Sequence, residues 1–123
     1  MLINLSNHPS SRWSAEQRQA AEQAFGGVVD LEFPPIDPTA SSQAVLELAQ
    51  NYLQQVLDRL TAPLSQQAVH IMGEMTFTYA FVSLAHAQGV RCVASTSRRN
   101  VTELEDGKQV HFRFVAFRDY ITV

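Results

Sequence analysis

The chain opens with the stretch LINLSNHPSS, residues 2–11, and this stretch decides the fold. Its apolar first half, residues 2–5, is typical of a short buried strand, and its second half places hydroxyls, an amide and an imidazole directly after that strand. Open α/β sheets bind ligands at the carboxyl ends of their strands. We therefore expect a strand followed by a ligand-facing loop that carries Ser6, Asn7, His8, Ser10 and Ser11.

Two later apolar runs also end in polar residues. The run Ala68–Ile71 leads into Met72–Thr76, and the run Val90–Ala94 leads into Ser95–Arg99. The carboxyl ends of parallel strands meet at one edge of a sheet, so the three polar segments are expected to form one site. The candidate ligand-contacting positions in the two later segments are Gly73, Glu74, Thr76, Thr96, Ser97, Arg98 and Arg99.

Helical patterns separate the apolar runs. Apolar spacings of three and four residues predict helices over residues 14–25, from residue 41 or 42 to about 60, and over 76–88. Residues 28–33 predict a further strand that a group of prolines closes. Alternating residues on both sides of Asp106-Gly107 predict a hairpin built from 101–105 and 109–117.

This order of elements predicts an α/β fold. We expect a Rossmann-like, mostly parallel sheet with helices on both faces and a C-terminal β-hairpin. If the third strand lies beside the first, on the side away from the second, the strand order reverses between them. The ligand crevice would then lie between the loops 6–12 and 72–76.

Composition limits the classes of function. The chain has 123 residues and a net charge of −3, which predicts a single domain over 1–123 and argues against a broad surface for duplex nucleic acid. It contains no run of about 18 apolar residues, so we expect a soluble, cytoplasmic protein with no membrane partner. The single cysteine, Cys92, lies in an apolar run and is expected to be a buried, unreactive thiol.

Each candidate residue has a structural interpretation beside the functional one. His8 is either a general acid, a general base or a phosphate donor, or it is an ordinary loop histidine. Glu74 is a site residue or the cap of a helix, and Arg98 and Arg99 bind phosphate oxygens or lie on a solvated turn. Trp13 stacks on a base or anchors the loop to the core.

The other histidines predict no metal site. His70 lies in a buried run and is expected to be a hydrogen-bonded core residue. His86 and His111 have no spacing that would place them together as zinc ligands. No phosphate-binding glycine motif is present either, which argues against dinucleotide binding and ATP hydrolysis.

Three motifs of this chain resemble a known group of proteins: INLSNHPS at 3–10, followed by Trp13, HIMGEMTF at 70–77 and ASTSRR at 94–99. The group consists of small stand-alone bacterial proteins associated with type III CRISPR loci, and its architecture is similar to the CRISPR-associated Rossmann-fold (CARF) domain. The resemblance in layout covers nearly the whole chain. It implies a homodimer that binds cyclic oligoadenylate, a ring of adenosines joined by 3′,5′-phosphodiesters, with cyclic tetra-adenylate as the first candidate. Members called ring nucleases cut that ring, and no cofactor is implied.

The resemblance also implies roles for individual positions. Arg98, with the backbone amides near Gly73, would contact the phosphate, and His8 or Glu74 would assist proton transfer. The nucleophile would be the ribose 2′-hydroxyl, which gives linear products with 2′,3′-cyclic phosphate ends. The ligand-facing positions that it implies are Ser6, Asn7, His8, Ser10, Gly73, Glu74, Thr76, Thr96, Ser97 and Arg98.

Two other classes of function stay open. The chain could be a non-catalytic nucleotide sensor or sequestering module that regulates a partner through the helix 76–88 or the hairpin. It could also be a structural or interaction subunit with a Rossmann-like core and no ligand.

Overall fold

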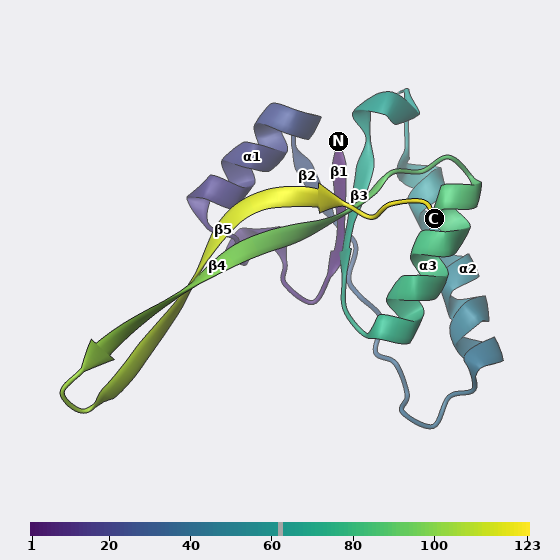
Figure 1. Ribbon diagram of the computed structural model, residues 1–123. Coiled ribbons are helices and arrows are strands. Elements are labelled where there is room, and N and C mark those ends of the chain that lie inside the picture. Colours follow the sequence, from purple (N-terminus) through teal and green to yellow (C-terminus); the bar gives the residue numbers. More distant parts are fainter. Residues whose placement is uncertain (62) are drawn as a thin grey trace.

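One five-stranded sheet runs through the computed structural model, which describes residues 1–61 and 63–123 (Figure 1). The first four strands along the sheet are parallel, and the last two pair antiparallel. In order across the sheet, the strands are β2 (Val28–Asp30), β1 (Leu2–Ser6), β3 (Ala68–Met72), β4 (Cys92–Leu104) and β5 (Gly107–Asp119). The predicted α/β class, and the reversal of strand order between β1 and β3, are confirmed.

Helices cover both faces of the sheet. Helix α1 (Ala15–Phe25) packs on one face, whereas α2 (Ser42–Arg59) and α3 (Met75–Ala87) pack together on the other (Figure 1). Serine side chains cap α1 and α2: Ser14 Oγ accepts from the Gln17 amide at 3.2 Å and Ser41 Oγ from the Ala44 amide at 3.1 Å. Two short 3₁₀ turns, η1 (Ser10–Arg12) and η2 (Leu64–Gln66), complete the elements.

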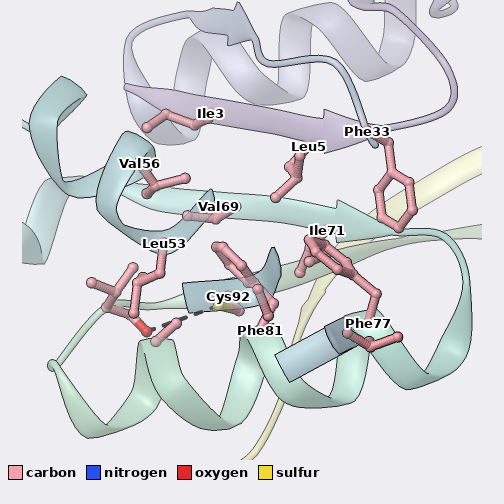
Figure 2. Packing of buried hydrophobic residues seen from close by; sticks show 14 residues of the cluster. Ile3, Leu5, Phe33, Leu53, Val56, Val69, Ile71, Phe77, Phe81 and Cys92 are labelled. Atoms are coloured by element: carbon pink, nitrogen blue, oxygen red, sulfur yellow. Dashed lines mark hydrogen bonds between the residues drawn. The ribbon is translucent and has the colours of Figure 1, made fainter. Parts of the chain in front are cut away.

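The main core lies between the sheet and the helices α2 and α3 (Figure 2). Strand residues alternate in direction, so Ile3 and Leu5 of β1 point to this core while Leu2 points to α1. Phe77 and Phe81 of α3 are fully buried, and each such side chain contributes roughly 1.5–3 kcal/mol of burial free energy. This core fixes the carboxyl ends of β1 and β3, where the candidate loops begin.

Strand β2 is shorter than residues 28–33. It pairs with β1 only from Leu2↔Val28 to Asn4↔Asp30. After Asp30 the chain turns so that Phe33 can enter the core, where its ring lies 5.0 Å from that of Phe77. Phe33, at the end of the predicted strand 28–33, therefore belongs to the core beside α3 and not to a strand.

Strand β4 corrects a second expectation. The segment Ser95–Arg99 was expected to end a strand, and residues 101–105 and 109–117 to form a separate hairpin. Instead β4 runs without a break from Cys92 to Leu104, and β5 pairs with it along its whole length. The polar run marks the place where β4 leaves the body of the protein and becomes solvated, with an irregularity in the pairing at Thr96/Ser97. The far part of β4 and β5 projects as a long arm (Figure 1).

Two smaller expectations can also be compared with the structure. Cys92 is fully buried, as predicted, and burial raises the pKa of its thiol to about 12. Within residues 1–61 and 63–123, no helix combines the length and the apolar character needed to cross a bilayer.

Candidate functional site

A hollow of about 640 Å³ opens where β4 separates from β3. The two strands pair only at Val69↔Cys92 and His70↔Val93, after which β4 continues into the arm. The hollow is therefore bounded by the carboxyl ends of β1 and β3, the loop after β1, the start of α1 and the base of the arm. We call it the strand-end hollow; its lining residues are Ser6, Asn7, His8, Arg12, Trp13, Ser14, Gln17, His70, Met72, Gly73, Ser95, Thr96, Ser97, Phe112 and Phe114.

The structure brings half of the sequence candidates into this hollow. The three polar segments do converge on one edge of the sheet, as the parallel strands require. The candidates that line the hollow are Ser6, Asn7, His8, Gly73, Thr96 and Ser97.

The loop that carries His8 is held by its backbone. The His8 amide donates to Ser6 Oγ at 3.2 Å, and the His8 carbonyl accepts from Asn4 Nδ2 at 2.9 Å and from Trp13 Nε1 at 3.1 Å. The imidazole itself is exposed and lines the hollow. This arrangement fixes the position of the loop and leaves the side chain available to a ligand.

Asp30 ties the same loop to β2. Its carboxylate accepts from Asn4 Nδ2 at 2.8 Å, from the Ser10 amide at 3.0 Å and from Ser10 Oγ at 2.8 Å. Burial alone would raise the pKa of Asp30, but these hydrogen bonds outweigh it and lower the pKa below its usual value. Ser10, which the sequence selected for ligand contact, therefore has a structural role in holding the loop to β2. Ser11, also selected, is exposed on η1 and does not line the hollow.

His70 lies in the buried wall of the hollow, with 2% of its surface exposed. Its ring packs edge-on against Trp13 at 5.2 Å and Phe117 at 5.7 Å between centroids. Burial, and to a lesser extent the neighbouring His8, lowers the pKa of His70 to about 4. The ring is therefore neutral at physiological pH.

Gly73 is required by packing. A Cβ atom at this position would lie 2.3 Å from the Phe33 ring, far inside van der Waals contact. The sequence left open whether this glycine admits a ligand or forms a tight turn. The structure shows that its absent side chain makes room for Phe33.

Glu74 and Thr76 lie at the N-terminus of α3 and line a different hollow, together with Asp37. The Glu74 carboxylate accepts from the Thr76 amide at 3.0 Å, the Phe77 amide at 2.8 Å and Thr76 Oγ1 at 2.7 Å. The bond from the Phe77 amide, followed by those from Thr76, lowers the pKa of Glu74. The helix begins at Met75 rather than at Thr76 because Glu74 is its cap.

Arg98 lies on the other face of the arm. Residues opposite each other in an antiparallel pair point to the same face, and Arg98 is opposite Arg113, whose guanidinium binds Glu16 at 3.0 Å. Arg99 is opposite Phe112 and shares the face that lines the hollow. The cation in the lining itself is Arg12, which the sequence analysis did not select.

The strand-end hollow suits an anion better than its neighbours do. Of the described residues that line it, none is acidic, although the chain carries a net charge of −3. An adjacent hollow beside β2 is lined by Asp30 and Glu32, and the hollow at α3 by Asp37 and Glu74. A single guanidinium, amide and hydroxyl groups and aromatic faces remain in the lining, and phosphate and bases bind to such groups.

The aromatic faces come from the arm. Phe112, which is 70% exposed, and Phe114 both line the hollow. The sequence assigned Phe112 and Phe114 only to a hairpin. Their spacing of two residues, which places both side chains on one face of a strand, was the signal that could have identified them. Arg12 was not selected, although the loop 6–12 was expected at the crevice, because it stands at the far end of that loop from the strand. His70 was not selected because it lies inside an apolar run.

The comparisons with known proteins give a family. A family described as "Uncharacterized protein MJ1673 family" matches residues 1–118 of the chain. The chain belongs to the MJ1673 family. No curated protein and no solved structure matches the chain. The description of the MJ1673 family links it neither to CARF domains nor to CRISPR loci, so that resemblance stays a prediction.

In this MJ1673-family protein the hollow combines polar, cationic and aromatic side chains. Two imidazoles, one exposed and one buried, lie with hydroxyl and amide groups near Arg12 and two phenylalanines. Among the described residues, no group of three or more histidine, cysteine or acidic side chains is arranged to hold a metal ion.

Proposed function

We propose that this chain binds a cyclic oligoadenylate, with cyclic tetra-adenylate as the first candidate, in the strand-end hollow and cleaves it to linear products with 2′,3′-cyclic phosphate ends. One observation carries the proposal: the hollow combines Arg12, exposed aromatic faces and hydroxyl donors with a described lining free of carboxylates. The resemblance of the strand-end motifs to CARF-like proteins supplies the identity of the ligand.

The parts of such a ligand match different parts of the hollow. A phosphodiester needs a cation and neutral donors, which Arg12 and the hydroxyls of Ser97 and Ser14 offer. An adenine needs a flat apolar face, and stacking on an aromatic ring contributes about 1–3 kcal/mol per base. Phe112 is the exposed ring in the lining.

The proposed cleavage uses the ligand's own nucleophile. The ribose 2′-oxygen attacks the adjacent phosphorus, a P–O2′ bond forms, and the P–O5′ bond breaks. The 2′-hydroxyl loses its proton and the departing 5′-oxygen gains one. His8, exposed in the lining, is the group that we assign to proton transfer, and Arg12 takes the phosphate contact first expected of Arg98.

We also propose that two copies pair. The exposed face of α3 and the C-terminal segment carry Met75, Tyr79 and Ile121, which are 83%, 77% and 77% exposed. They line an apolar hollow of about 660 Å³ that shares Met72 and Gly73 with the strand-end hollow. An apolar group of this kind is typical of an interface. Light scattering should give the mass of two chains, and Tyr79→Glu should give the mass of one.

The test of the function is direct. Purified protein is incubated with labelled cyclic tetra- and hexa-adenylate in the presence of EDTA, and the products are separated. Linear fragments with 2′,3′-cyclic phosphate ends support the proposal, and failure to bind either ring overturns it. His8→Ala should slow cleavage at least tenfold while His111→Ala, the same change on the arm, should not.

The arginines offer a second matched pair. Arg12→Ala should weaken binding roughly tenfold or more, because a charged hydrogen bond to phosphate contributes about 1.5–3 kcal/mol. Arg18→Ala removes the same charge from an exposed position on α1 outside the lining. If both variants bind equally well, the phosphate does not lie at Arg12.

One observation favours the non-catalytic alternative. Glu74 is committed to capping and His70 is buried and neutral, so His8 is the one exposed proton-transfer group in the described lining. Retention of the intact ring without any product would identify the chain as a sequestering module. The same incubation separates the two.

A further inference from the structure

The two ring nitrogens of His70 have different surroundings. The Nδ1 atom lies 2.8 Å from Asn4 Oδ1. The Nε2 atom is buried and has no hydrogen-bond partner among the residues that the structure describes. The sequence predicted a hydrogen-bonded core histidine, and only one of its nitrogens meets that expectation.

The neighbours of Asn4 fix which nitrogen carries the proton. Asn4 Nδ2 donates to the Asp30 carboxylate at 2.8 Å and to the His8 carbonyl at 2.9 Å, and both of these groups only accept. The amide oxygen of Asn4 must therefore face His70. Because an amide oxygen cannot donate, Nδ1 carries the proton, and Nε2 of the neutral ring is an acceptor.

His70, which carries this unpaired acceptor, is one of the residues that line the strand-end hollow, although its Nε2 atom is closed to solvent. Buried acceptors are normally hydrogen-bonded, so an unpaired one at a ligand site calls for a donor. A phosphate oxygen cannot serve, because it only accepts. The lining thus offers two chemically different groups, a donor at Arg12 and an acceptor at His70.

We propose that His70 Nε2 accepts a hydrogen bond from the bound nucleotide and thereby selects ligands that carry a donor at this point. The inference rests on the proposed function, and it adds which edge of the nucleotide is recognised. Two groups of an oligoadenylate could supply the donor: the ribose 2′-hydroxyl and the adenine N6 amine. His70 acts here as a specificity-determining residue, set by Asn4 and Asp30.

The Trp13 indole gives a readout of binding. It is the only tryptophan of the chain, and its ring contacts that of His70. Because Nε2 is closed to solvent, a donor reaches it only if side chains around the ring shift. Trp13 emission should therefore change when the ligand binds, on a time scale short compared with turnover.

The experiment compares three probes: cyclic tetra-adenylate, its 2′-deoxy analogue and its analogue with purine in place of adenine. We expect the wild type to bind one analogue at least tenfold more weakly, which identifies the donor. His70→Phe keeps the ring and removes the acceptor, so it should bind all three probes with similar affinity. His70→Gln keeps an acceptor and should restore part of the difference.

Several results would overturn the inference. The role of His70 is contradicted if the wild type binds both analogues with the same affinity as the parent ring. It is also contradicted if His70→Phe discriminates among the probes as the wild type does. Either result leaves the proposed function standing. If the wild type binds none of the probes, the proposed function fails and this inference fails with it.

A ligand-free measurement tests the same step. The ¹⁵N shifts of the His70 ring should show a protonated Nδ1 and an unprotonated Nε2. A protonated Nε2 in the free protein overturns the inference whatever the ligand is, and this test needs no variant to fold.

Discussion

Asn4, in the middle of β1, donates a hydrogen bond of 2.8 Å to Asp30, the last residue of β2. The same Asn4 amide reaches the His8 carbonyl and the His70 ring, so one buried side chain connects three parts of the site. Its exposed fraction is 1%.

Asn4→Ala should lower the free energy of unfolding by about 2–4 kcal/mol, because it removes one donor each from the Asp30 carboxylate and the His8 carbonyl and leaves the buried Nδ1–H of His70 without its acceptor. Urea denaturation measures this change. Asn100→Ala, on the exposed arm, is the matched control and should have almost no effect. Equal effects of the two substitutions would mean that the network contributes nothing to stability.

Acid should destabilise the protein through His70. The pKa of His70 is about 4 in the folded chain, whereas the ordinary value of 6.5 applies to the unfolded chain. As the pH falls, the unfolded chain therefore binds the proton first. Stability is therefore fully present above about pH 6.5 and declines by about 3 kcal/mol down to pH 4. Asp30, whose pKa is lowered, adds its own loss only at more acidic pH.

Denaturant unfolding at a series of pH values measures the effect. His70→Gln should flatten the curve between pH 6.5 and 4 and leave the more acidic branch in place. A variant that keeps the full slope would assign the pH dependence to other groups.

Gly73→Ala should destabilise the protein by about 1–3 kcal/mol, since its methyl group would overlap the Phe33 ring. The double variant Gly73→Ala with Phe33→Leu tests the cause. Its loss should be clearly smaller than the sum of the two single losses. Additive losses would mean that contact with Phe33 is not the reason why position 73 requires glycine.

The Cys92 thiol should resist alkylation in the native protein. It is fully buried and its pKa is raised to about 12, so almost no thiolate forms and none is accessible. Labelling with iodoacetamide should be slow in buffer and fast in denaturant. Rapid labelling of the folded chain would show that β4 opens locally.

Phe112→Ala should weaken ligand binding about 5- to 150-fold and leave the free energy of unfolding nearly unchanged, because the ring is 70% exposed. Val110→Ala, on the same face further along the arm, is its control and should bind the ligand normally. Equal affinities for Phe112→Ala and the wild type would remove the arm from the site.

The sequence was a good guide where local patterns decide the structure. Apolar spacing placed the helices, and the apolar runs followed by polar residues correctly indicated that the ends of β1 and β3 share one edge with the segment Ser95–Ser97. That segment was nevertheless misread as a strand end. A run of polar residues is the same in sequence whether a strand stops or continues into solvent, and only the pairing with β5 distinguishes the two.

Side-chain direction was the least predictable part. Arg98 and Arg99 are neighbours in sequence, but strand alternation sends them to opposite faces of the arm. The sequence offered capping as one of two roles for Glu74, and the bond from the Phe77 amide decides for it. The half-paired ring of His70 depends on a contact with Asn4. The contact between His70 and Asn4 joins two distant strands, which no local pattern encodes.

The arm separates the residues that form one wall of the hollow from the residues that stabilise the fold. Beyond the base of the arm, β4 and β5 are paired with each other and exposed, while the apolar core lies in the body. Substitutions at Phe112 and its neighbours can therefore reshape one wall of the hollow without loosening the core. Under the proposed function, ligand preference would be free to diverge during evolution while the folded body stays the same.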